Sequence, residues 1–131
     1  MHDYEVIWSR ESIYDVADIA DYIEQRFGKD RADRFNDEID VECEALGSDY
    51  KLYTGTGISY RGKLILKKVF DPSILFYFVD DKFKKVYIIR ILRHERNWQK
   101  ILKTRQDRAF TAFFCVFLNM KHMIRASVGI P

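Results

Sequence analysis

The spacing of hydrophobic residues predicts a helical first third of the chain and a strand-rich remainder. Residues 4–8 predict a short strand, and Ser9 behind it is suited to cap a helix by accepting a hydrogen bond from a free backbone N–H group. Between residues 9 and 27 the hydrophobic positions recur every three or four residues, which is the pattern of an amphipathic helix. These positions are Ile13, Val16, Ala17, Ala20, Ile23 and Phe27.

A second helix is predicted over residues 30–46, with Asp30 as its cap and Gly47 as its stop. Its hydrophobic face consists of Ala32, Phe35, Ile39, Cys43 and Leu46. Gly28 follows the first helix, where a left-handed C-cap is expected. Because only Gly28, Lys29 and Asp30 join the two helices, we expect an antiparallel helical hairpin.

The period of the pattern changes after the glycine-rich residues 48–62, which predict a loop. Residues 63–70, 74–79 and 86–92 read as strands, and tight turns between them make them antiparallel neighbours. We expect the strand at residues 4–8 to join the same antiparallel sheet, and residues 95–103 to form one further short helix. The predicted class is therefore α+β: an N-terminal strand, an antiparallel helical hairpin packed on one face of a small antiparallel sheet, and a short C-terminal helix.

The same periodicities predict the side chains that form the core between the sheet and the hairpin. On the sheet they are Leu64, Leu66, Leu75, Tyr77, Ile89 and Ile91, and on the helices Ile13, Val16, Ile23, Phe35 and Ile39.

Composition places the chain among soluble globular proteins, since 47% of its 131 residues are hydrophobic and 32% are charged. The two cysteines, Cys43 and Cys115, match no metal spacing, and the three histidines are scattered. We therefore expect no metal, no cofactor and no disulfide framework, which fits a reducing compartment. The first residues lack the basic and apolar regions of a secretory signal.

Charge is distributed unevenly along the chain. Residues 1–60 hold 6 Lys/Arg and 15 Asp/Glu, whereas residues 61–131 hold 16 Lys/Arg and 5 Asp/Glu. A basic half of this size indicates contact with phosphates or with an acidic partner. Alternatively, the two halves neutralise each other inside one fold, and the sequence leaves both explanations open.

Three stretches together resemble the RelE/ParE superfamily of bacterial toxins from type II toxin–antitoxin modules. They are residues 18–28 followed by Ala32 and Phe35, the central strand at residues 74–80, and residues 87–98, which end in His-Glu-Arg-Asn-Trp. The resemblance covers about residues 4–103, which we take as the toxin domain. Residues 104–131 form an extension of unknown role, and its apolar run at 109–118 is shorter than the about 20 residues of a membrane span.

The resemblance implies a cytoplasmic bacterial toxin that is neutralised by an acidic antitoxin encoded beside it, with a possible homodimer inside the complex. ParE-like members inhibit DNA gyrase, whereas RelE-like members are ribosome-dependent mRNA endonucleases (mRNA interferases). The long hairpin with its Tyr-Ile, Gly and Ala-x-x-Phe pattern favours the ParE-like alternative. The RelE-like alternative stays open.

Candidate site residues follow from these two alternatives. A nuclease must activate a ribose hydroxyl, stabilise charge on a phosphate and protonate a leaving oxygen. If the chain is RelE-like, His94, Arg96 and Arg61 are the catalytic candidates. The candidates for binding a partner or RNA are Arg61, Lys63, Lys67, Arg90 and Arg93. Structural roles compete with these: the lysines can be a solvated strand face, Arg96 can pair with a hairpin carboxylate, and Trp98 can pack on the sheet.

Overall fold

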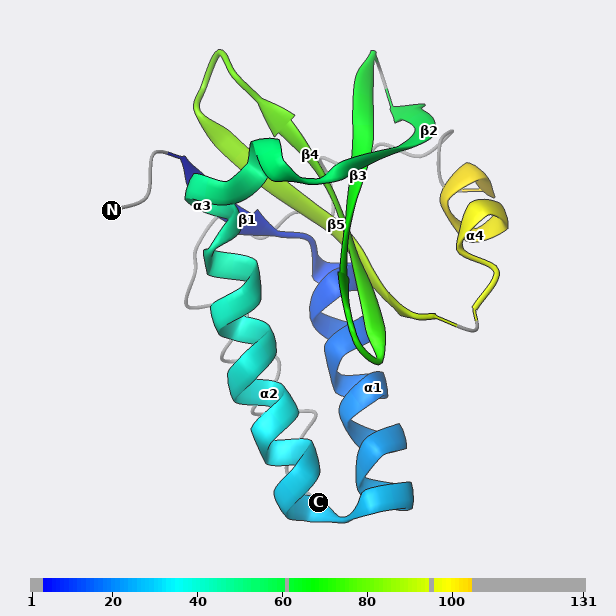
Figure 1. The fold of residues 1–131 in the computed structure, drawn as a ribbon. Helices are drawn as coiled ribbons and strands as arrows, with labels where there is room; N and C mark the ends of the chain where they lie inside the picture. The colour runs from blue at the N-terminus through cyan, green and yellow to red at the C-terminus, as the bar shows by residue number, and fades with distance from the viewer. Residues whose placement is uncertain (1–3, 61, 95, 105–131) are drawn as a thin grey trace.

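The computed structural model describes residues 4–60, 62–94 and 96–104 (Figure 1). Predictions that concern Arg61, Glu95 or the extension beyond residue 104 lie outside the described residues and stay predictions. Within the described ranges, no helix is long and apolar enough to cross a membrane.

The architecture is α+β, as the sequence predicts. The elements follow in the order β1 (Glu5–Trp8), α1 (Arg10–Phe27), α2 (Lys29–Glu44), α3 (Leu46–Asp49), a short 3₁₀ helix η1 (Tyr50–Leu52), β2 (Thr54–Tyr60), β3 (Lys63–Phe70), β4 (Ser73–Asp80), β5 (Lys85–Arg93) and α4 (Trp98–Thr104). The five strands form one sheet in the order β1-β5-β4-β3-β2. Helices α1 and α2 run side by side, and the end of their hairpin projects beyond the sheet (Figure 1).

The caps of the helical hairpin are mostly those that the sequence predicts. The Ser9 hydroxyl accepts a hydrogen bond from the Ser12 N–H at 3.0 Å. Gly28 adopts a φ of 92°, and its N–H donates to the Glu24 carbonyl at 2.9 Å. The predicted cap at Asp30 is wrong, because α2 already begins at Lys29. Gly28 is both the C-cap of α1 and the N-cap of α2. Asp30 instead lies in the first turn of α2, where a carboxylate interacts favourably with the helix dipole.

Strand β1 departs from the predicted antiparallel arrangement. It pairs in parallel with β5, with Val6 opposite Val86 and Trp8 opposite Ile88, whereas the other neighbouring strands are antiparallel. Tight turns fix the relative direction only of strands that follow one another directly. β1 is separated from β5 by both long helices and the rest of the sheet, so no turn determines its direction.

The predicted loop at residues 48–62 contains regular structure. Gly47 does not stop the helical region, since it lies within α3, and its carbonyl accepts a hydrogen bond from the Tyr4 N–H at 3.0 Å. Strand β2 pairs with β3 at the sheet edge, with an irregularity between Gly55 and Ser59. Gly57 there has a φ of 81°. An edge strand with glycines and a bulge lacks the clean alternation that identifies a strand in a sequence.

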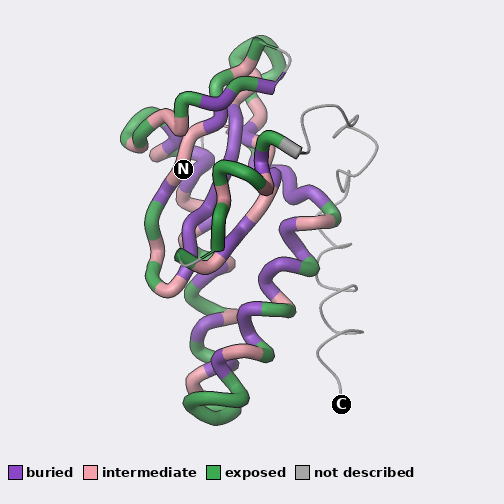
Figure 2. The backbone as a smooth tube through the Cα atoms, turned by 90° about the vertical axis from the view of Figure 1, so that its right-hand side faces the viewer, coloured by how far each residue is buried: buried purple, intermediate pink, exposed green. Residues whose placement is uncertain are grey.

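Buried side chains form one cluster on each face of the sheet. The cluster under the hairpin contains Leu75, Tyr77 and Ile91 from the sheet, together with all five predicted helical residues. Leu66 packs against it partly buried. A second cluster lies on the opposite face, where α4 covers Phe76 and its neighbours with Trp98, Ile101 and Leu102. Along both long helices, buried residues alternate with exposed ones, because one side of each helix packs into the cluster under the hairpin (Figure 2).

Two predicted core positions are wrong. Ile89 lies in the cluster on the opposite face, because Phe76 pairs with Arg90 and Tyr77 with Ile88, which leaves Ile89 as an extra residue in a bulge of β5. Ile88 takes its place under the hairpin. Leu64 is 48% exposed, since α1 packs mainly on β5 and does not reach the start of β3.

Neighbouring residues of β3 provide a test of this arrangement. Ile65 is fully buried in the cluster on the α4 side, so Ile65→Ala should lower the free energy of unfolding by about 2–5 kcal/mol. Leu64→Ala should lower it by about 1 kcal/mol or less, because half of that side chain is already in water. Urea unfolding followed by circular dichroism measures both values. A larger loss for Leu64 than for Ile65 would contradict the register of β3.

Candidate functional site

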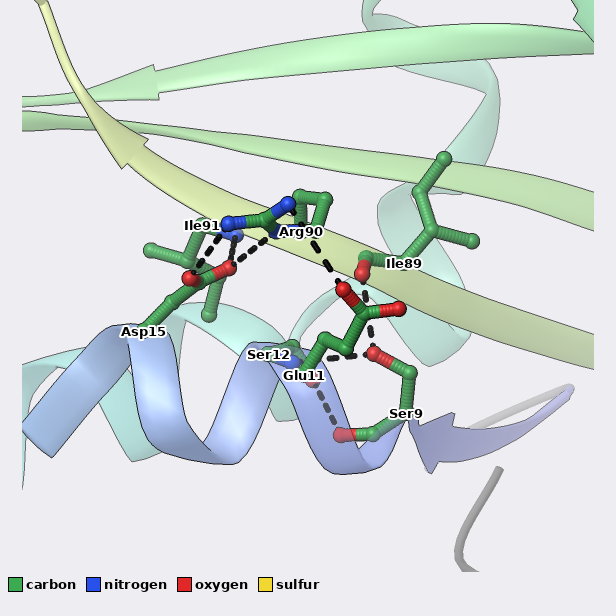
Figure 3. A network of polar contacts seen from close by, with 7 residues as sticks. All are labelled: Ser9, Glu11, Ser12, Asp15, Ile89, Arg90 and Ile91. Carbon is green, nitrogen blue, oxygen red and sulfur yellow. Dashed lines mark hydrogen bonds and ion pairs between the residues drawn. The ribbon is translucent and has the colours of Figure 1, made fainter. Parts of the chain in front are cut away.

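The side chains of Ser9, the N-cap of α1, and of Asp15 within α1 complete the sheet where β1 ends. The last residue of β1, Trp8, pairs with Ile88, and the next N–H, that of Ser9, donates to the Ile88 carbonyl at 2.9 Å. Beyond this point the Ser9 hydroxyl donates to the Ile89 carbonyl at 2.8 Å, and the Asp15 carboxylate accepts from the Ile91 N–H at 3.0 Å (Figure 3). Backbone groups of β5 that would otherwise lose their partner are thus satisfied by the helix.

Arg90 forms a buried, bidentate ion pair with the Asp15 carboxylate. Its Nε and Nη2 atoms donate to the two Asp15 oxygens at 2.7 and 2.8 Å, and Glu11 lies 3.7 Å from its Nη1 atom (Figure 3). The side chains of Arg90 and Asp15 are 11% and 10% exposed. Burial raises the pKa of the Asp15 carboxyl, and the Arg90 guanidinium and the Ile91 N–H oppose that effect. The sequence proposed Arg90 as a binding residue, and the structure gives it a role in holding α1 on β5.

Three of the predicted residues come together at the end of β5; we call Arg93, His94 and Arg96 the β5-end cluster. The Arg93 guanidinium lies 3.7 Å from the centre of the Tyr22 ring on α1. The His94 N–H donates to the Pro72 carbonyl at 3.1 Å, and its Nε2 atom lies 2.5 Å from an Asp71 carboxylate oxygen.

Arg96 closes the turn through its backbone. Its N–H donates to the Arg93 carbonyl at 3.0 Å, and its side chain is exposed. The sequence suggested that Arg96 could pair with a carboxylate of the hairpin, and one such carboxylate, that of Asp15, is held by Arg90. Arg96 lines a small cavity whose wall also includes Asp15 and Asp18.

The two candidate lysines of β3, Lys63 and Lys67, contact different groups. The Lys63 ammonium lies 3.8 Å from an Asp80 oxygen. The Lys67 ammonium lies 5.0 Å from the centre of the Trp98 ring, which itself packs on Phe76 as the sequence predicts. Lys67 is paired with Phe76 across the strands and therefore belongs to the α4 side of the sheet.

Ion pairs join the acidic and basic halves of the chain. Besides Arg90 and Asp15, Lys85 pairs with Glu5 at 2.7 Å, and Lys68 pairs with Glu42 at 3.1 Å. Lys68 is almost fully buried and also donates to the Glu42 carbonyl, near the end of α2. Since α2 has no basic residue in its last turn, Lys68 supplies the cation that favours a helix C-terminus. Mutual neutralisation therefore accounts for part of the charge asymmetry.

The chain is similar to known proteins both in sequence and in fold. The sequence model of the family described as "ParE toxin of type II toxin-antitoxin system, parDE" matches residues 6–98. The chain belongs to this family. A solved structure titled "Chromosomal ParDE TA system from P. aeruginosa" superimposes with a TM-score of 0.57 at 22% identity, over 72% of this chain and 100% of that one. No curated protein matches the chain.

The ParE match extends from β1 into the beginning of α4. It therefore includes the contact of Ser9 and Asp15 with β5 as well as the β5-end cluster. The similarity to the P. aeruginosa structure supports the fold, and the matched region carries the family assignment.

The buried pair of Asp15 and Arg90 provides a prediction on stability. Asp15→Ala should lower the free energy of unfolding by about 3–5 kcal/mol, because it leaves the Arg90 charge and the Ile91 N–H buried without a partner. The double variant Asp15→Leu with Arg90→Met should recover much of the loss, since no unpaired charge remains. Denaturant titration measures the free energy of unfolding of the wild-type chain, of Asp15→Ala and of the double variant.

The matched control is the surface pair of Lys85 and Glu5. Glu5→Ala should cost about 1 kcal/mol or less, because solvent screens that pair. Equal losses for Asp15→Ala and Glu5→Ala would show that the buried pair does not hold α1 on the sheet.

Proposed function

We propose that this ParE-family chain is a toxin that arrests bacterial growth by acting on DNA gyrase in the cytoplasm and is neutralised by an acidic antitoxin encoded beside it. The observation that carries the proposal is the family match over residues 6–98, which includes both long helices and at least part of every strand of the sheet. The ParE-like pattern of the hairpin, from Tyr22 and Ile23 through Gly28 to Phe35, supports the same choice.

The positions of the candidate basic residues also favour a binding protein over a nuclease. A nuclease needs an acid, a base and cations within reach of one phosphate. Among the described residues, Arg90 is held in a buried ion pair, and Lys67 lies on the α4 side over Trp98. His94 and Arg96 are exposed at the end of β5, whereas Lys63 contacts Asp80, which pairs with Lys85 at the other end of that strand.

One observation favours the RelE-like nuclease as a second candidate. His94 is exposed, and its imidazole contacts the Asp71 carboxylate at 2.5 Å. A carboxylate that orients a histidine is an arrangement used in general acid–base catalysis. Arg96, two residues further along, is an exposed cation that could contact a phosphate.

The two candidates can be separated by assaying the purified chain with gyrase and supercoiled DNA, beside the same chain with translating ribosomes. We expect inhibition of gyrase and intact mRNA. His94→Ala should change growth arrest only modestly, because a gyrase inhibitor acts by binding. A nuclease that uses His94 should instead lose about 10²–10⁴ in rate while still binding its partner. Cleaved mRNA that disappears in His94→Ala would refute the gyrase proposal.

Exposed and partly exposed basic residues are the proposed surface for the acidic antitoxin. On β3 these are Lys63 and Lys67, and at the end of β5 they are Arg93 and Arg96. Lys63→Glu with Lys67→Glu should weaken antitoxin binding and make it less sensitive to salt, since both effects follow from charge attraction. Isothermal titration at low and high ionic strength measures this.

Lys51→Glu is the matched control, because Lys51 is an exposed lysine in the acidic half of the chain. It should leave both the affinity and its salt dependence nearly unchanged. If the control and the β3 variant weakened binding equally, net charge rather than the β3 surface would explain the interaction.

A further inference from the structure

A surface cavity of about 630 Å³ lies between the helical hairpin and the turn that joins β3 to β4. In Figure 1 this turn reaches down beside α1. The volume is within the about 300–1,000 Å³ that is typical of ligand pockets. None of the residues that line the cavity is among the site residues that the sequence indicates.

One part of the cavity wall is apolar. Tyr22, Ile23 and Phe27 come from the last two turns of α1, and Pro72 comes from the β3–β4 turn. Phe27 is 69% exposed, although burying an aromatic ring of this size is favourable. An apolar side chain placed in the cavity would remove part of the Phe27 ring from water.

The other part of the wall is cationic. Arg31 and Arg34 lie one helical turn apart on α2, and both line the cavity. The Arg31 Nη1 atom is buried and makes no hydrogen bond within the described part of the chain. This atom forms an ion pair with the Glu38 carboxylate at 3.7 Å, which is beyond hydrogen-bond distance. A buried donor without a hydrogen bond is costly, so an oxygen that reaches the Arg31 Nη1 atom would bind favourably.

Charges around the cavity define which anion fits. The guanidinium groups of Arg26 and Arg93 lie 4.8 and 3.7 Å from the centre of the Tyr22 ring, so positive charge surrounds this side. Asp71 also lines the cavity and contacts His94. The Asp71 carboxylate would repel a phosphate dianion more strongly than a single carboxylate, because the repulsion grows with the charge of the ligand.

We propose that this cavity binds an acidic peptide segment of the antitoxin, in which an apolar or aromatic side chain is followed by a carboxylate. The apolar side chain packs against Phe27 and Pro72, and the carboxylate accepts hydrogen bonds from Arg31 and Arg34. The proposal rests on the proposed function, since it names the part of the partner that this cavity recognises. Arginine suits the task because its planar guanidinium can bind a carboxylate through two hydrogen bonds.

Short peptides test the chemistry of the cavity without the antitoxin. The probes are N-acetyl-Phe-Glu-amide, its neutral isostere N-acetyl-Phe-Gln-amide and N-acetyl-Ala-Glu-amide, each titrated into the full ¹⁵N-labelled chain. We expect N-acetyl-Phe-Glu-amide to shift the backbone amides of Phe27 and Arg31 and to bind about tenfold more tightly than either other probe. Equal binding of all three probes, or shifts elsewhere on the chain, would overturn the proposal.

The antitoxin itself tests the partner. Arg31→Gln with Arg34→Gln should weaken its binding by about tenfold or more, and the loss should shrink at high salt. Arg10→Gln, at an exposed arginine at the other end of α1, is the matched control and should change little. The single variant Arg34→Gln separates loss of binding from loss of folding. Because Arg34 is exposed, its replacement should leave the unfolding midpoint unchanged.

The outcomes separate this inference from the proposed function. If the antitoxin binds the wild-type chain and the double variant equally well, the cavity is not its binding site, while the toxin assignment stands. If the antitoxin does not bind the wild-type chain at all, the proposed partnership fails. In that case the peptide titration alone decides whether the cavity recognises a carboxylate beside an apolar side chain.

Discussion

The fold depends on the contact between the first two turns of α1 and the exposed edge of β5. β1 is only four residues long, so β5 loses its neighbouring strand after Ile88. Ser9 and Asp15 satisfy the backbone of β5 from there on, and Arg90 fixes the Asp15 carboxylate in place. Because the same helix carries the hydrophobic residues that cover the sheet, one contact both completes the sheet and orients the hairpin.

The sequence predicts those structural features that depend only on residues close together in the chain. Ser9 and Gly28 delimit α1 as predicted, since capping and a positive φ are local requirements. The bulge at Ile89 and the parallel direction of β1 could not be predicted, because both are set by pairing between residues far apart in the sequence. The alternation of hydrophobic residues along β5 predicts Ile89 under the hairpin. The bulge adds one residue to the strand, and this moves the Ile89 side chain to the opposite face.

The same distinction applies to the candidate site. The motif at the end of β5 brings Arg93, His94 and Arg96 together, because they follow one another in a single turn. A sequence does not reveal which cations are used inside the fold. Arg90 and Lys68 look like surface residues in their alternating strands, yet both are largely buried against carboxylates of the hairpin. Their partners, Asp15 and Glu42, are distant in sequence and close only after folding.

This use of cations inside the fold changes how the charge asymmetry bears on function. The basic residues that pair with the acidic half cannot also provide the attraction for a partner, because their charge is largely balanced within the fold. Among the candidate and cavity residues that the structure describes, a smaller set remains for binding: Lys63 and Lys67 of β3, the β5-end cluster, and the hairpin arginines Arg26, Arg31 and Arg34 near Tyr22. The last group lies in the half whose net charge is negative, and net charge therefore conceals it. The position of an arginine next to a cavity, rather than the sign of its segment, determines whether it can bind an anion.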